Sequence, residues 1–415
     1  MTETVTSEDT AELLPEFPLR FGEEESRTDG ALAYAHLATG DPVTRVRLPS
    51  GRPAWLVTGY QEVRSVLTDA RASRQAAARS DGAQVLAVER VGTSILTLDP
   101  PDHTRLRRIV GRGFTARRSE ALRPRIAEMA GELLDDLAAG PRPADINEQF
   151  CMLLPVRVIC ELLGVPLGDR HRFEAWRDAL IAPTGPDRPF DAGAHQALLA
   201  YIGELVAAKR KEPGDDLLSI LAAAGQGPSD KDDALTDQEI VALGGTLLVA
   251  GFETTVAQLG LCLREILGRP EGLLSVPTER TELAAEVEEL VRRLPIGNFG
   301  GTLARQATED MEVGGVRIRA GEVIVAATQA ANFDPAAFPA PLDHDPARDN
   351  GSHQMAFGFG VHHCLGSPVA RIEIQEALLA LRTRFPDMRL AVPDEELRFV
   401  PGAASRRLER FPVTW

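Results

Sequence analysis

A stretch of about thirty residues near the middle of the chain constrains the fold more than any other feature. It begins at Thr236, which together with Glu239 forms the Thr-x-x-Glu pattern of a capping box, and it continues to Gly268, just before Pro270 ends the helical pattern. At 1.5 Å per residue such a helix is about 45 Å long, which is enough to cross an entire domain. Its middle, LLVAGFETTVAQL, is apolar on nearly every side. The sequence therefore predicts a long helix buried in a large core.

The segments around this helix predict a mostly helical protein with small sheets, of the α+β type. Helical periodicity extends over roughly residues 115–270, whereas residues 42–67 indicate two short strands around a Ser-Gly turn and then a helix. Short strands are also expected in MEVGGVRI, GEVIVAA, LRFV and FPVTW, all after residue 300. No Pro-, Ser- or Gly-rich linker divides the chain. We therefore expect one domain over residues 16–415, preceded by a flexible acidic lead at residues 1–15.

The composition excludes several classes of partner. The net charge of −16 argues against nucleic acid and anionic membrane surfaces. The four cysteines do not form the pattern of a disulfide framework, which favours a reducing cytoplasm. The start of the chain lacks a signal-peptide pattern, and the most apolar run, residues 240–251, is shorter than a membrane span. We expect a cytoplasmic protein, monomeric and without a membrane partner.

The segment FGFGVHHCLG, residues 357–366, raises the question of what Cys364 does. The residues after it have helical apolar spacing, with Pro368 in the first turn, so Cys364 is expected just before a helix N-terminus, where the positive end of the dipole favours a thiolate. Three interpretations follow from the residues alone: a buried structural cysteine, a thiolate ligand approached by a flat partner, or a zinc ligand with His362 and His363. Adjacent side chains converge poorly on a tetrahedral ion, which disfavours zinc.

The order Phe-Gly-x-Gly-x-His-x-Cys-x-Gly resembles the haem-binding loop of the cytochrome P450 superfamily, in the form found in soluble actinobacterial members. The residues at its fixed positions are Phe357, Gly358, Gly360, His362, Cys364 and Gly366. The resemblance extends from about residue 42 to residue 415. It implies a fold in which haem b lies between a long distal helix and a proximal Cys loop and helix. Cys364 would then be the axial ligand of the haem iron, a thiolate that favours O–O cleavage, and His362 would contact a propionate, with no role for His363.

The centre of the long helix supports the same resemblance. Its Ala250-Gly251-Phe252-Glu253-Thr254 segment matches the family's Ala/Gly-Gly-x-Asp/Glu-Thr pattern. The Thr254 hydroxyl is within reach of the Ala250 carbonyl one turn earlier, which would loosen the helix locally. The resemblance implies a groove that holds O2 beside the haem, with Thr254 and Glu253 assisting proton delivery. The alternative is that the small residues only allow close helix packing.

Two further groups of residues match the family's pattern, one expected to stabilise the fold and one expected to bind the cofactor. Glu289-x-x-Arg292 and Arg348 would form the family's structural Glu-Arg-Arg cluster, although Phe333 stands where an Arg is usual. Basic residues that the resemblance assigns to the haem propionates, besides His362, are His103, Arg107 and Arg305.

An arginine-rich segment suggests how electrons arrive. Between Thr104 and Ser119 there are six arginines and no acid, and Arg105, Arg108 and Arg112 are predicted to face away from His103. We expect this stripe to bind an acidic ferredoxin reduced by a ferredoxin reductase, unless its arginines pair with carboxylates of the chain itself. No flavin or nicotinamide fingerprint is present, so neither cofactor is expected to be bound.

The expected activity is O2-dependent hydroxylation or epoxidation of a small, mostly apolar molecule in secondary metabolism. The pocket residues suggested by the resemblance are Thr246, Val249, Ile296, Asn298 and Phe299, with contributions from residues 74–97 and 165–200 and from Ala403 and Ser405. Oxidative coupling or desaturation on the same fold is the alternative. A non-enzymatic haem sensor or carrier is disfavoured, because such a protein has no use for the Glu253–Thr254 pair.

Overall fold

The computed structural model describes residues 14–17, 30–48, 50–81, 83, 94–169, 172, 192–224, 234–297, 303–401, 403 and 405–415. The chain forms two compact units, the first over Met1–Asp99 and Gly297–Cys364, the second over Pro100–Ile296 and Leu365–Trp415. Most of the predicted lead at residues 1–15 lies outside the described residues. Each unit is described by itself.

The long predicted helix is confirmed as α12, Asp237–Leu267 in the second unit. The capping box is complete, because the Glu239 amide donates to the Thr236 hydroxyl at 3.2 Å and the Thr236 amide donates to the Glu239 carboxylate at 2.8 Å. An 18-residue window of α12 has a mean hydropathy of 1.7, so among the described helices it alone is long and apolar enough to cross a membrane. This corrects the estimate from residues 240–251. Of that window 56% is buried inside the protein, as in the core helix of a soluble protein.

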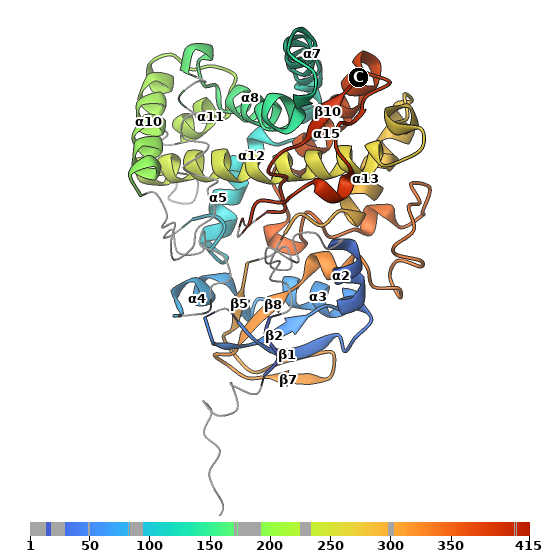
Figure 1. The fold of residues 1–415 in the computed structure, drawn as a ribbon. Helices are drawn as coiled ribbons and strands as arrows, with labels where there is room; N and C mark the ends of the chain where they lie inside the picture. The colour runs from blue at the N-terminus through green and yellow to red at the C-terminus, as the bar shows by residue number, and fades with distance from the viewer. Residues whose placement is uncertain are drawn as a thin grey trace, which may run out of the picture. The chain divides into compact units, whose positions relative to one another are not determined.

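The second unit is helical around α12, which runs the length of the helical layer and contacts α8, α10, α11, α13 and α15 (Figure 1). The helices are α5 (Asp102–Val110), α6 (Ala116–Ala121), α7 (Arg123–Ala139), α8 (Leu153–Leu163), α10 (Ala192–Lys211), α11 (Leu217–Ala224), α12, α13 (Arg280–Arg293) and α15 (Ser367–Arg384). A small sheet of order β4-β10-β9 joins Ala144–Asp145, Pro412–Thr414 and Arg389–Leu390. The predicted LRFV strand is wrong, since only an isolated bridge between Phe399 and Leu408 forms there.

Glycines allow α12 to pack closely against its neighbours. A Cβ atom built on Gly244 would lie 2.7 Å from the Ile202 side chain of α10, and one built on Gly251 would lie 2.8 Å from the Ile159 side chain of α8. Contacts of this length mean that a side chain at either glycine would force the facing isoleucine to shift. Close packing against side chains of neighbouring helices therefore explains Gly244 and Gly251.

The first unit is built on a five-stranded sheet of order β1-β2-β8-β5-β3. Its strands are β1 (Val43–Arg47), β2 (Pro53–Val57), β3 (Ala72–Ser73), β5 (Arg305–Ala307) and β8 (Val323–Ala326), and a separate hairpin joins β6 (Met311–Val313) to β7 (Val316–Ile318). The helices are α2 (Gly30–Ala38), α3 (Tyr60–Thr68), α4 (Arg74–Arg79) and α14 (Thr328–Ala331). The strands predicted in residues 42–57, MEVGGVRI and GEVIVAA are confirmed, as is FPVTW in the second unit.

The central strand β8 shows why this sheet has two cores. Its side chains alternate, so Val323 and Val325 pack with one cluster that includes Phe333, whereas Ile324 packs with another that includes Phe338. All four residues of β8 are buried, as expected for a strand covered on both faces. Phe333, found in place of the family's usual arginine, is thus part of an apolar core.

Candidate functional site

The Cys364 loop is held by backbone geometry that requires glycine. Gly358 and Gly360 adopt φ angles of 75° and 72°, in the left-handed region. A Cβ atom on Gly360 would lie 2.6 Å from the Leu67 carbonyl oxygen of α3, so the loop rests directly on that helix. The Cys364 amide donates to the Phe357 carbonyl at 2.8 Å, which fixes the cysteine backbone. Its side chain is exposed, unlike those of the three other cysteines.

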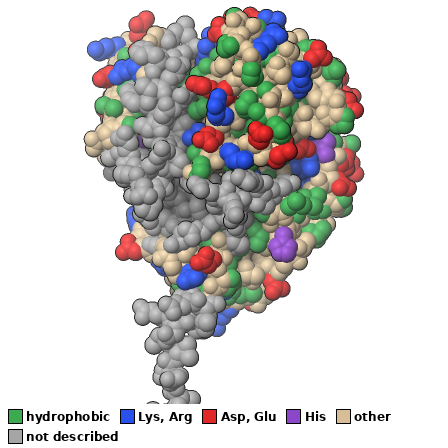
Figure 2. Space-filling view, viewed as in Figure 1, with side chains coloured by type: hydrophobic (Ala, Val, Ile, Leu, Met, Phe, Trp, Pro, Cys, Tyr) green, Lys and Arg blue, Asp and Glu red, His purple; other side chains and the backbone are tan. Residues whose placement is uncertain are grey.

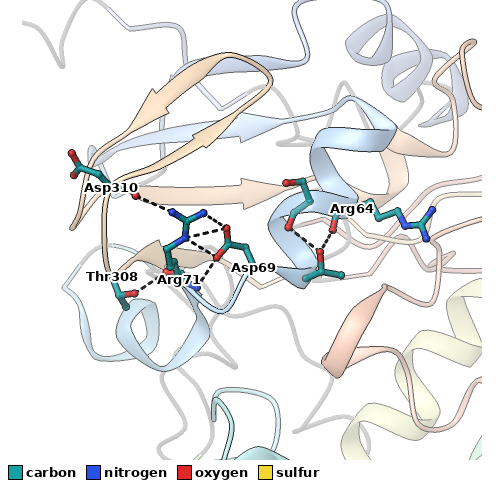
Figure 3. Close-up of polar contacts among 7 residues, drawn as sticks. Arg64, Asp69, Arg71, Thr308 and Asp310 are labelled. Carbon is teal, nitrogen blue, oxygen red and sulfur yellow. Dashed lines mark hydrogen bonds and ion pairs between the residues drawn. The ribbon is translucent and has the colours of Figure 1, made fainter.

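Helix α3 holds this loop through side chains as well. The Arg64 guanidinium lies over the Phe359 ring, 4.7 Å from its centroid, in a cation–π contact. The Thr68 hydroxyl bonds the Arg64 carbonyl at 3.0 Å, and just beyond α3 the Arg71 guanidinium pairs with Asp69 and donates to the Asp310 carbonyl at 3.1 Å (Figure 3). These bonds connect the end of α3 to the strands of the same unit, so the support for the Cys loop is rigid.

The helix predicted after Cys364 is confirmed as α15, with Pro368 in its first turn. The interpretation of Cys364 as a buried structural residue is wrong, because the thiol is exposed. The zinc interpretation also lacks support. Within the described ranges, no three His, Cys, Asp or Glu side chains gather as a metal-ligand group.

The centre of α12 combines an exposed face with a half-buried acid. Thr254 and Ala250 are exposed in the middle of a partly buried helix, and the predicted bond from the Thr254 hydroxyl to the Ala250 carbonyl is present at 3.0 Å. The adjacent Glu253 accepts a hydrogen bond from the Ser405 hydroxyl at 3.0 Å. Burial raises the pKa of the Glu253 carboxyl, while the Ser405 bond and the positive charge of Arg407 act to lower it. An acid that retains its proton more readily than usual thus stands next to an exposed hydroxyl.

A second unusual group, Arg305 on β5, belongs to the first unit. Only 3% of Arg305 is exposed, and its Nη1 atom has no hydrogen-bond partner in the part of the chain that the structure describes. Burial lowers its pKa well below the usual value, the positive charge of Arg74 lowers it further, and Asp99 partly offsets both. Asp99 is already bonded to the Ser73 hydroxyl and the Arg74 amide at the start of α4. Because a guanidinium does not give up its proton in proteins, this site calls for an anion.

Comparisons with known proteins identify the family. Residues 193–386 match the family model for Cytochrome P450. The nocardicin C N-oxygenase of Nocardia uniformis subsp. tsuyamanensis is 44% identical over 92% of this chain and 94% of its own length. The mycinamicin IV hydroxylase/epoxidase of Micromonospora griseorubida is also 44% identical, over 92% of this chain and 94% of that protein. The chain belongs to the cytochrome P450 family. A solved structure of the mixed-function P450 MycG, 43% identical, has a TM-score of 0.84 and covers 92% of this chain and 95% of its own.

This cytochrome P450 is an oxidoreductase of the monooxygenase class, with haem b as its cofactor and a small organic molecule as its substrate. When bound, the haem supplies the activation of O2. The residues present fit that group. Arg305 needs an anion, which a propionate provides, and the Cys364 side chain is exposed after a loop that contains Gly358 and Gly360. Arg74, which sequence reasoning missed, contributes to the positive charge around Arg305.

The other predicted cofactor residues of this cytochrome P450 are distributed over both units. His103 is buried and Arg107 half-buried on α5, one turn apart, in the second unit. His362 is half-buried in the single turn Gly360–His362 of the first unit. Their joint contact with one haem stays a prediction.

The Glu-x-x-Arg pair of this cytochrome P450 is a buried structural element, as expected. Arg292 donates to both carboxylate oxygens of Glu289, at 2.7 and 2.8 Å, and neither side chain is more than 2% exposed. Such a two-pronged pair satisfies a charge that would otherwise be costly inside a protein. Arg348 lies in the first unit, where it donates to the Pro339 and Asp343 carbonyls of its own loop. The three-residue cluster therefore stays a prediction.

One part of the predicted arginine stripe is wrong. Arg105 pairs with Glu239 at the start of α12 and donates to the Ala234 carbonyl at 2.7 Å, so it is bound inside the second unit. The acid that engages it lies far along the sequence, beyond the reach of a helical pattern. Arg108 and Arg112 are exposed. On the face drawn in Figure 2, Lys and Arg side chains are interspersed with Asp and Glu, which is a mixed surface.

The predicted substrate residues are only partly described. Thr246 and Val249 are half-buried on α12, and the Ile296 carbonyl accepts the Arg406 amide at 2.7 Å. Asn298 and Phe299 lie outside the described residues, as do parts of 74–97 and 165–200. Hydrogen bonds therefore connect Ile296, the C-terminal turn and Glu253 within the second unit.

Proposed function

We propose that this cytochrome P450 inserts one oxygen atom into a small, mostly apolar secondary metabolite, by hydroxylation or epoxidation. The observation that carries this proposal is the exposed Thr254 at the centre of α12, next in sequence to the half-buried acid Glu253, whose pKa is raised by desolvation. The names of two relatives support the substrate class: one is an N-oxygenase of nocardicin C, the other a hydroxylase and epoxidase of mycinamicin IV. A product heavier by one oxygen distinguishes this activity from coupling or desaturation, in which hydrogen is lost.

The proposed cofactor residues follow from fit and resemblance together. Cys364 would be the axial ligand of haem iron, Phe357 would contact the macrocycle, and the small residues Gly358, Gly360, Gly366 and Ala250 would leave room for it. Arg305, His103, Arg107 and His362 would bind its two propionates. The unsatisfied Nη1 of Arg305 is the strongest support, because a carboxylate would complete it with a charge-assisted hydrogen bond.

The residues of α12 have distinct roles in this proposal. Glu253 holds a proton on its carboxyl group, since burial raises its pKa and makes the neutral form more accessible than for an exposed glutamate. Thr254 lies on the exposed face of the helix, and its hydroxyl donates to the Ala250 carbonyl at 3.0 Å, which leaves the lone pairs of the hydroxyl oxygen available. The hydroxyl can therefore bind a polar reactant or a water, and Glu253 can replace the proton that leaves.

The proposed function also requires an electron donor. We propose an acidic ferredoxin, supplied with electrons by a ferredoxin reductase and NAD(P)H, that docks on the exposed Arg108 and Arg112 of the second unit. Their exposure and the absence of acids from Thr104 to Ser119 support this docking site. We also propose that the two units act as one catalytic domain over residues 16–415, and that the protein is monomeric and cytoplasmic.

Thr254→Ala tests the proposed proton delivery. We expect the fraction of NAD(P)H electrons that appear in product to fall about tenfold or more, because general acid–base assistance is lost, while substrate still produces a binding difference spectrum. Thr255→Ala is the matched control: Thr255 makes the same bond one residue on, from its hydroxyl to the Gly251 carbonyl at 3.1 Å, but on the buried side. Full coupling in Thr254→Ala would show that the proposed role is wrong.

A further inference from the structure

The turn near the C-terminus places one hydroxyl with unusual precision for a loop. The Arg406 amide donates to the Ile296 carbonyl at 2.7 Å, and the Val400 amide donates to the Arg407 carbonyl at 3.0 Å. On the far side, the Asn147 side chain donates to the Leu408 carbonyl at 2.8 Å. The backbone of residues 406–408, which directly follow Ser405, is thus bonded to Ile296, Val400 and Asn147. Only 4% of Ser405 is exposed, so water competes little for its hydroxyl.

That hydroxyl donates to Oε1 of Glu253 at 3.0 Å, across 152 positions of the sequence. A hydrogen bond from a hydroxyl to a carboxylate favours the ionised form and limits the directions in which the carboxyl can point. Burial acts in the opposite sense, since it favours the neutral form. The Ser405 hydroxyl and the positive charge of Arg407 both oppose the effect of burial on the pKa of Glu253.

We propose that Ser405 is a positioning residue for Glu253, which orients the carboxyl group and keeps its ionised form accessible between proton transfers. The inference rests on the proposed role of Glu253 in proton delivery. Ser405 itself touches no reacting atom in this scheme. Ser405 affects coupling only through Glu253. A purely structural hydrogen bond would instead affect the stability of the fold whether or not Glu253 is present.

The consequence for pH dependence has a definite sign. Without the hydroxyl, burial is less opposed, so the pKa of Glu253 rises further. A higher pKa means that the carboxyl loses its proton only at a higher pH, and the limb of the pH profile that reports its ionisation moves upward. Ser405→Thr keeps a hydroxyl at the same place and is expected to leave the limb near its original position.

The experiment is a double-mutant cycle on the holoenzyme with Ser405→Ala, Glu253→Gln and the double variant. We expect Ser405→Ala to lower coupling about threefold to tenfold, as for loss of one hydrogen bond to a charged group, and Ser405→Thr to restore most of it. In the Glu253→Gln background, Ser405→Ala should cause no further loss. Additive losses in the double variant would overturn the inference. Ser119→Ala, a change at another buried serine of the second unit, controls for general effects of removing a buried hydroxyl.

An infrared titration gives a readout that does not depend on turnover. The carboxylic-acid C=O band of Glu253, identified by its absence from Glu253→Gln, should persist to higher pH in Ser405→Ala than in the wild-type protein. An unmoved titration would overturn the inference even if coupling fell. A third outcome is that Glu253→Gln leaves coupling intact while the Glu253 band of Ser405→Ala still persists to higher pH. The proposed role of Glu253 in proton delivery would then be wrong, and the effect of Ser405 on Glu253 would be confirmed.

Discussion

At the scale of single residues, the most informative side chains of this cytochrome P450 are those that its fold leaves electrostatically incomplete. Arg305 is buried with one nitrogen unsatisfied among the described residues, and Asp99, which opposes its charge, is bonded to the start of α4. A protein tolerates such a group when a ligand completes it. The apoprotein therefore carries a cost that haem binding removes, and the residue contributes to cofactor affinity more than to the stability of the fold.

Arg305→Leu tests this assignment. We expect haem affinity to fall about 10- to 100-fold, which corresponds to the loss of a hydrogen bond to a charged group, while the unfolding free energy of the apoprotein stays equal or rises. The measurement is the rate of haem transfer to an acceptor globin, together with denaturant unfolding of the apoprotein. Arg317→Leu, at an exposed arginine paired with Asp310 on the surface, is the matched control. Equal haem retention in both variants would exclude the propionate role of Arg305.

At the scale of elements, the loop that carries Cys364 depends on α3 for its conformation. Gly360 combines a φ of 72° with an approach to the Leu67 carbonyl that leaves no space for a side chain. Arg64 stacks on Phe359 in the same region. The geometry around the cysteine is thus set by a helix almost three hundred positions earlier in the sequence, and the local glycine pattern only permits it.

Gly360→Ala should destabilise this loop by about 1–3 kcal/mol, because a non-glycine residue is strained at positive φ and the new Cβ meets backbone. Thermal unfolding of the holoenzyme measures the loss. Gly366→Ala is the comparison: its φ is −82° and a Cβ there meets nothing within 4 Å. The fold should therefore accept Gly366→Ala. If this variant still binds haem more weakly, the new methyl group must contact the macrocycle. Equal stability of the two variants would contradict the account of Gly360.

Local patterns in the sequence predicted local structure well. The capping box of Thr236 and Glu239 and the bond from Thr254 to Ala250 both join residues within four positions, where helical geometry determines what can meet. Contacts between distant segments were not predictable in this way. The helical pattern predicts an outward-facing Arg105 because it contains no information about Glu239, which is 134 positions away. The bond from Ser405 to Glu253 spans 152 positions and is hidden from local patterns in the same way. The predictions for Asn298 and Phe299 stay untested by the described residues.

At the scale of the whole molecule, charge determines which partners can approach. The chain has a net charge of −16, so an acidic ferredoxin is repelled by most of it and needs a local basic surface. Arg108 and Arg112 are exposed on or just after α5. Arg105 is half-buried and paired with Glu239, so it does not belong to that exposed surface. The docking surface that we propose is therefore smaller than the sequence alone predicted.

Arg108→Glu combined with Arg112→Glu should slow reduction by ferredoxin about tenfold or more at low salt, with the difference shrinking as salt screens the charges. Stopped-flow reduction at several ionic strengths measures this. The same reversal of charge at Arg389 and Arg410, exposed at the small sheet of the second unit, is the control. Equal slowing in both pairs would indicate a net-charge effect and would refute a docking site on α5.

The glycines of α12 have a consequence for how this enzyme can be altered. Because Gly251 leaves no space toward Ile159 of α8, the position of the helix segment that carries Glu253 and Thr254 is set from behind, by the size of a side chain on another helix. A smaller residue at Ile159 would allow that segment to relax away from the exposed face. Mutational libraries aimed at a new substrate range thus have a further target in the buried Ile159, on the side of α12 away from its exposed residues.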